Sequence, residues 1–261
     1  MTEPSESAPE PISGSPISGS PISGSPISGS EVVKIDLGGR EVALRPRRNR
    51  RARHISLRID PATGCAILVL PLSASLAEGL DFARSKSRWL RANLDSLPQR
   101  TPFADGACIP VMGIRHRIAH HPDFASFIWR DSSSATINVG GEGEGVAMRV
   151  TVWLREQARR EITMRARVKA ARLGRPLGSI TIRETRTRWG SCSGKCDLAF
   201  NWRLIMAPAD VLDYVVSHEV AHLAVTSHSP RFWRVVEKLH PGNEEPRAWL
   251  RKRGDELWRY G

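Results

Sequence analysis

The residues His218-Glu219-Val220-Ala221-His222, followed shortly by His228, are the strongest indication of the fold and chemistry of this chain. Residues four positions apart share one face of an α-helix, so the imidazoles of His218 and His222 can reach one metal ion. Glu219, three residues before His222, flanks the same site. Three imidazole ligands leave the fourth position of a zinc ion open, as is typical of catalytic sites. The spacing therefore predicts hydrolysis by a metal-activated water.

The sequence around these residues has the apolar spacing of a buried helix. The apolar positions are Leu212, Val215, Val216, Val220 and Leu223. Their spacing predicts a helix over 210–225. Buried polar side chains without partners cost about 1–3 kcal/mol each, and one metal ion satisfies several imidazoles at once. The following Ser227-His228-Ser229-Pro230 predicts a turn and a new helix, which lets His228 return to the same site.

The chain divides into a tail and two regions. Residues 11–30 are four copies of Pro-Ile-Ser-Gly-Ser after an opening rich in Pro, Ser and Glu. Such a composition cannot bury enough apolar surface to fold, so we predict a disordered tail over 1–30. The Gly-Glu run at 140–145 is a flexible junction. We therefore predict an N-terminal β-rich region over 31–145 and a metal-binding region over 146–261.

The pattern of elements predicts an α+β fold. Val32 to Ile35 and Glu41 to Leu44 flank a Gly38-Gly39 turn, and two further strands at 55–59 and 66–70 complete an antiparallel sheet over 31–71. The remaining predicted elements are a helical segment at 75–95, strands at 108–120 and 126–139, a long helix at 147–173, a strand at 180–183 and a closing helix at 244–259. An N-terminal antiparallel β region is thus followed by a region built around the metal helix.

Other segments carry a resemblance to a known family. They are Arg188-Trp189-Gly190-Ser191-Cys192, Phe200-Asn201-Trp202-Arg203-Leu204, Asp213-Tyr214-Val215-Val216, His228-Ser229 and Phe232-Trp233. With the H-E-x-x-H motif they resemble the YgjP-like (DUF45) family of zinc metallopeptidases, which is similar to SprT-type and M48-type zincins. The resemblance covers about residues 32–258. It implies a zincin-like C-terminal region, Zn²⁺ held by His218, His222 and His228, and Glu219 as general base or acid.

The segment Arg188-Trp189-Gly190-Ser191 allows two interpretations. In the first it binds substrate: Arg188 would hold a carboxylate or phosphate, and Gly190 would let backbone N–H groups approach the substrate closely. In the second it is an internal clamp, with Trp189 in the core and Arg188 paired with an acid such as Asp213. The residues alone leave both open.

The chain is strongly basic, with 39 Lys and Arg against 27 Asp and Glu and a formal charge of +12. Arginines crowd residues 40–58, and a dense guanidinium cluster suits phosphates, so this segment is a candidate for weak nucleic-acid binding. A solvated pair of strands is the alternative. The charge also keeps two functions open beside cleavage of a peptide or protein substrate: a metal-dependent nucleoside triphosphate pyrophosphatase or phosphohydrolase acting on a nucleotide, and a DNA-associated SprT-like protease module.

The sequence also bears on the cellular location of the protein and on the state of its cysteines. No run of eighteen apolar residues and no secretory signal occur, so we expect a cytoplasmic protein without a membrane partner. Four irregularly spaced cysteines predict no disulfide framework, and Cys192 with Cys196 is a weak metal signal. We expect His240 to be a loop residue.

Overall fold

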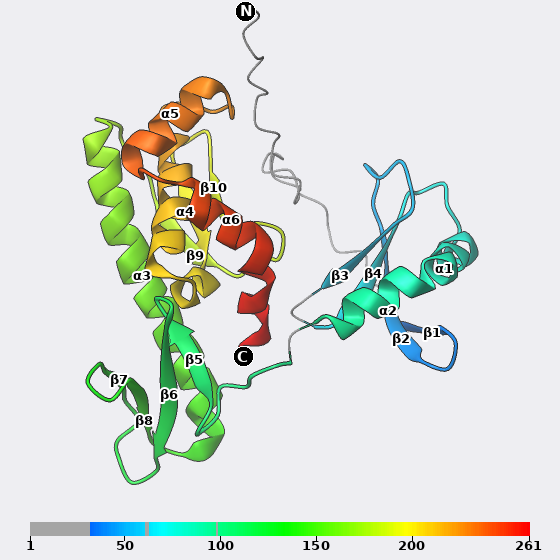
Figure 1. Ribbon diagram of the computed structural model, residues 1–261, viewed down its shortest axis with the longest axis horizontal. Helices are drawn as coiled ribbons and strands as arrows, with labels where there is room; N and C mark the ends of the chain where they lie inside the picture. Colours follow the sequence, from blue (N-terminus) through cyan, green and yellow to red (C-terminus); the bar gives the residue numbers. More distant parts are fainter. Residues whose placement is uncertain (1–31, 61–62, 98) are drawn as a thin grey trace, which may run out of the picture. The chain divides into compact units, whose positions relative to one another are not determined.

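The computed structural model describes residues 32–60, 63–97 and 99–261 and shows a mixed α+β protein (Figure 1). Contacts divide it between Arg100 and Thr101 into two units, each with its own hydrophobic core. The division differs from the predicted boundary at 145–146, because Val139 and Val150 on either side of that boundary belong to one core. The predicted tail over 1–30 lies outside the described residues.

The first unit contains a four-stranded sheet and two helices. Its elements are β1 (Val33–Asp36), β2 (Glu41–Arg48), β3 (Ser56–Asp60), β4 (Cys65–Leu70), α1 (Leu76–Ser85) and α2 (Ser87–Asp95). The strand order is β1-β2-β4-β3, and β4 runs parallel to β2. The predicted all-antiparallel sheet is therefore wrong at this pairing. The apolar run of β4 is buried between two strands, whereas the alternating β3 lies at an edge.

Both helices of this unit contribute to the core on one face of the sheet, where Ala83 and Leu90 join Leu44 and Ala66. Gly79 allows α1 to approach closely, because a Cβ there would lie 2.5 Å from a methyl group of Leu70. The predicted helical segment 75–95 is interrupted at Lys86, whose backbone angles (φ −99°, ψ 19°) are not helical.

The second unit begins with a sheet that repeats the topology of the first. Its elements are β5 (Cys108–Val111), β6 (Ile114–His121), β7 (Ile128–Asp131), β8 (Thr136–Gly140) and the long helix α3 (Val146–Arg172). The order β5-β6-β8-β7 again has a parallel central pair flanked by antiparallel pairs. Buried residues recur every four positions along α3, from Val146 to Ala170. They give this helix one continuous apolar side.

The rest of the second unit surrounds a central helix. Its elements are β9 (Ile180–Arg183), β10 (Gly190–Cys192), β11 (Leu198–Asn201), α4 (Ala209–Ala221), α5 (Pro230–Leu239) and α6 (Glu244–Arg253). Helix α4 contacts α3, α5, α6 and β10 (Figure 1). It ends at its C-cap, His222, before the predicted end at 225. The order β10-β11-β9 makes β10 an edge strand. Among the described residues, no helix has the length and apolar character needed to cross a membrane.

Candidate metal centre

Three histidines converge where α4 ends and α5 begins. His218 lies in the last turn of α4, His222 is its C-cap, and His228 lies just before α5. Each offers a ring nitrogen within 4.8 Å of the others, and Nε2 of His218 is 3.1 Å from Nε2 of His228. Two nitrogens bound tetrahedrally to zinc at about 2.1 Å would be roughly 3.4 Å apart. The donor set therefore fits an ion of this size.

Neighbouring groups orient these imidazoles. Nδ1 of His222 lies 3.1 Å from the carbonyl oxygen of Val225. That oxygen can only accept, so Nδ1 donates and Nε2 keeps its lone pair. The ring of Phe232 is 4.9, 4.5 and 4.8 Å from the rings of His218, His222 and His228. Burial lowers the pKa of all three histidines, that of His218 most strongly. Neutral imidazole is the form that binds a metal.

Glu219 is buried beside these histidines. It is 2% exposed, and its Oε2 has no hydrogen-bond partner among the described residues. Burial raises the pKa of Glu219 to about 8, although the charge of Arg188 acts in the opposite direction. A carboxyl group with this pKa can take up and release a proton near neutral pH.

Strand β10 passes over Glu219 at Gly190. A Cβ at Gly190 would lie 2.5 Å from both Cγ and Oε1 of Glu219, which is closer than real Cβ contacts. The space left by this glycine is therefore filled by the glutamate side chain. Ser191 and Cys192 follow on the strand and are half-buried. Burial, reinforced by the charge of Glu219, raises the pKa of the Cys192 thiol to about 11.

The adjacent residues Arg188 and Trp189 differ in their exposure to solvent. Arg188 is exposed, and its charge reaches Glu219. Trp189 is half-buried with its ring 5.9 Å from that of Trp258. Asp213, the acid suggested as a partner for Arg188 in the internal-clamp interpretation, instead lies within ion-pair distance of Arg165 and Lys169 and next to His240.

A family model for the YgjP-like, metallopeptidase domain matches residues 53–253. The chain belongs to this family. The YgjP-like match includes the three histidines and Glu219. The chain is also similar to a solved structure, the crystal structure of the metallopeptidase zymogen of Pyrococcus abyssi abylysin. The identity is 26%, over 35% of this chain and 93% of that chain, with a TM-score of 0.32. No curated protein matches.

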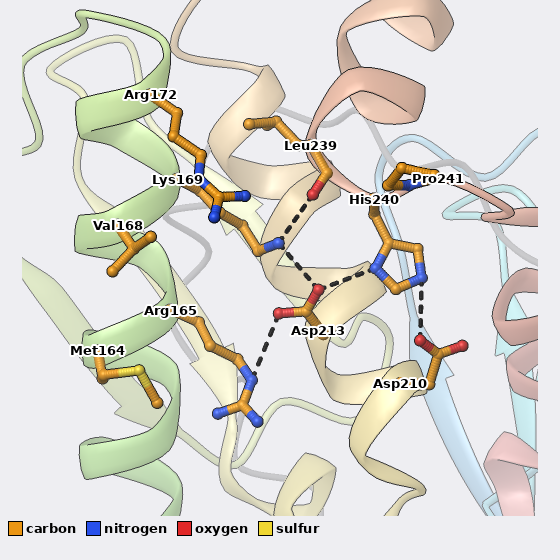
Figure 2. Close-up of a pocket in the computed structure, with 10 residues that line it drawn as sticks. All are labelled: Met164, Arg165, Val168, Lys169, Arg172, Asp210, Asp213, Leu239, His240 and Pro241. Carbon is orange, nitrogen blue, oxygen red and sulfur yellow. Dashed lines mark hydrogen bonds and ion pairs between the residues drawn. The ribbon is translucent and has the colours of Figure 1, made fainter.

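In this YgjP-like protein a polar cluster joins α3, α4 and the end of α5 (Figure 2). Asp213 of α4 accepts a hydrogen bond from Lys169 at 2.8 Å and lies 2.8 Å from Nδ1 of His240. Arg165 contacts its other oxygen at 3.4 Å. Lys169 also donates to the carbonyl of Leu239 at 3.0 Å. These residues line a solvent-open pocket of about 460 Å³.

Sequence reasoning missed two neighbours of the YgjP-like site. His240 lies after α5, in the connection to α6, as predicted, but it is buried, and its ring nitrogens lie 2.8 Å from Asp213 and 3.3 Å from Asp210. The guanidinium of Arg247 lies 4.5 Å from the ring centre of Trp233, which stacks on His228. Neither residue stands at a recognisable spacing from the H-E-x-x-H motif, so only the folded chain reveals them.

Replacing Asp213 with Asn should destabilise the fold at neutral pH. Lys169 is 7% exposed and would lose its acidic partner, at a cost of about 3 kcal/mol. Burial raises the pKa of Asp213, but the hydrogen bonds from Lys169 and His240 prevail and hold it below the ordinary 3.8. Stability from a lowered carboxyl pKa is present above the ordinary pKa and is lost as pH falls through the folded value.

The difference in unfolding free energy between wild type and D213N should therefore be constant near pH 7 and should shrink below pH 3.8. Urea unfolding at a series of pH values measures it. D210N is the matched control, because the Asp210 side chain is 65% exposed. If the difference in unfolding free energy between wild type and D213N keeps its size below pH 3.8, this explanation is contradicted.

Replacing Gly190 with Ala should impair turnover while leaving the histidines in place. The added methyl group would displace Glu219, and a displacement of about 1 Å at a reacting group can lower the rate roughly 100-fold. Bound metal and kcat should be measured together. Gly194 has nothing within 4 Å of an added Cβ, so G194A is the control. Full turnover by G190A would show that Glu219 tolerates the shift.

Proposed function

We propose that this YgjP-like protein is a zinc-dependent peptidase, with His218, His222 and His228 as metal ligands and Glu219 as the group that moves the proton. The observation that carries the proposal is the buried Glu219 carboxyl, one oxygen of which has no hydrogen-bond partner in the described part of the chain, next to three converging imidazoles. A structural role would leave that oxygen uncompensated at about 1–3 kcal/mol. A proton taken up during the reaction, together with a nearby metal cation, would provide the favourable interaction that this oxygen lacks.

Zinc is the metal that this donor set favours. Imidazole nitrogen suits zinc, whereas calcium and magnesium prefer oxygen ligands. Three protein ligands leave one position for the reactants. We therefore assign 146–261 a zincin-like role, with α4 as the H-E-x-x-H helix. The likeness to SprT-type and M48-type zincins noted from the sequence supports this assignment.

Each residue of the site has a separate part in the proposed reaction. A bound zinc ion supplies Lewis acidity for the scissile carbonyl and the attacking water. Glu219 accepts the proton from that water and returns it to the leaving amine. Burial of Glu219 raises its pKa to about 8, and a cation held by the neighbouring imidazoles would favour the ionised carboxylate that accepts this proton. Gly190 leaves the space in which this carboxyl sits.

Strand β10 supports a peptide as the substrate. Among the strands of the described residues it pairs with β11 alone, so its other backbone edge can accept an extended peptide as an additional strand. Because Gly190 touches Glu219, a peptide bound along β10 would run past the proton acceptor. Ser191 would contribute backbone groups to this pairing. The exposed Arg188 would hold an acidic group or carbonyl of the same peptide.

The test compares substrate classes on one preparation. The zinc-loaded chain is incubated with an unstructured peptide mixture and, separately, with nucleoside triphosphates. Peptide cleavage that disappears with a chelator and returns with Zn²⁺ is the expected result. Triphosphate cleavage without peptide cleavage would replace the proposal by the phosphohydrolase alternative. The densest arginine segment, on which that alternative depends, belongs to the other unit.

A further inference from the structure

The arginines of the first unit gather on one face of its sheet. On β2, Val42 and Leu44 are buried, and the arginines at 45 and 47 alternate with these core positions. On β4, Leu68 and Leu70 lie under α1. In the register of the sheet, Ile67 of β4 lies opposite Arg45 of β2 and Arg58 of β3. Val69 of β4 lies opposite Arg47 of β2 and Ser56 of β3. Because side chains alternate along a strand, Arg45, Arg47 and Arg58 emerge on the face opposite the helices. We call these three residues the arginine face.

The charge on this side of the sheet is unevenly distributed. Asp36 pairs in register with Glu41 at the start of β2, and Asp60 pairs with Cys65 at the start of β4. The acids thus lie toward one end of the strands. The opposite end leads into the segment after β2, where Arg50, Arg51, Arg53 and His54 are all exposed. Positive charge therefore continues from the arginine face into this segment.

Some arginines of the basic stretch, Arg40 and Arg48 among them, have structural partners. Arg40 forms an ion pair with Asp95. Arg48 donates to the backbone carbonyls of Leu72 and Ala74, at 3.2 and 2.9 Å, and so fixes the chain before α1. The structure therefore leaves fewer arginines of segment 40–58 as candidates for binding nucleic acid. Among the described residues, no acidic side chain lies within ion-pair distance of Arg45, Arg47, Arg50, Arg51 or Arg53.

We propose that the arginine face, with the adjoining residues 50–53, binds the phosphate backbone of nucleic acid. Arg45 and Arg47 lie about 7 Å apart along one strand, and β2 and β3 are separated by roughly 10 Å across β4, so the guanidinium groups form a two-dimensional array. Guanidinium forks match phosphate oxygens. No exposed large apolar side chain lies among the arginines at 45–58, as insertion into a lipid surface would require. The binding is therefore electrostatic and independent of base sequence.

The test measures binding of labelled single-stranded DNA, duplex DNA and single-stranded RNA by fluorescence anisotropy, with the full chain and a salt series from about 50 to 200 mM. The double variant R45Q/R47Q should bind at least about tenfold more weakly, and the slope of log affinity against log salt should fall by about two, one for each lost phosphate contact. Comparing the three probes identifies the preferred form of nucleic acid.

The matched control removes the same charge from the helical side of the unit. Arg88 and Arg91 are exposed on α2, so R88Q/R91Q should bind nearly as wild type. If both double variants lose the same affinity for nucleic acid, net charge alone accounts for the effect, and the proposal is overturned. Stronger binding to vesicles of anionic lipid than to any nucleic acid would also overturn it. Peptidase activity is not used in this test, so its outcome is independent of the proposed function.

Discussion

Glu219→Gln should lower kcat for peptide cleavage by about 10²–10⁴-fold, the usual contribution of a general acid–base group. The amide keeps the shape of the side chain, so it fits the space beside Gly190, but it cannot accept the proton. The three imidazoles remain, and zinc content should stay at one ion per chain. Steady-state kinetics and metal analysis of the same preparation measure both quantities.

A matched control for this variant is Glu245→Gln, at an exposed position in the first turn of α6. It should leave kcat unchanged. If E219Q cleaves peptide at a rate close to wild type, the proton must be taken by another group. If E219Q instead loses its zinc, the carboxyl contributes to metal binding, and the division of roles within the site is incorrect.

His222→Ala should remove both zinc and activity. One imidazole of three is lost, and its Nδ1 contact with Val225 shows that this ring is held in a single orientation. Changes to groups that merely support a ligand weaken metal binding by about 10–100-fold, so removal of the ligand itself should exceed that range. Competition with a chromophoric chelator gives the zinc affinity, and circular dichroism reports whether α4 is intact.

His54→Ala serves as the control, because this histidine is exposed and belongs to the first unit. It should bind zinc as wild type does. Wild-type zinc affinity in H222A would remove His222 from the ligand set. An unfolded H222A would be uninformative about zinc, so H222Q, which keeps a polar side chain at the C-cap, repeats the measurement.

The sequence predicted the elements of the site better than their surroundings. The H-E-x-x-H spacing and the apolar positions around it are local properties of one helix, and α4 contains His218 and Glu219. The turn before Phe232 is likewise local, and the structure brings His228 to within 3.1 Å of His218. Local periodicity carries this information because helix geometry fixes which side chains share a face.

Long-range pairings could not be predicted in this way. The parallel pairing of β2 with β4, and of β6 with β8, joins strands separated by another strand, and no local pattern encodes it. The partners of Asp213 come from α3 and from the residue after α5, 44 and 27 positions away. The composition of the Gly-Glu run predicts a domain junction, whereas buried residues on both sides of the run belong to one core.

That continuous core has a consequence for folding. The buried side of α3 extends from Val146, whose core also includes residues of β8, to Ala170, near the Lys169 contact with α4. A helix of this kind couples the elements that it touches, so loss of order at one end removes packing at the other. The metal ligands and the sheet of β5–β8 should therefore belong to one cooperative unfolding unit, and zinc binding should protect the amide hydrogens of that distant sheet from exchange.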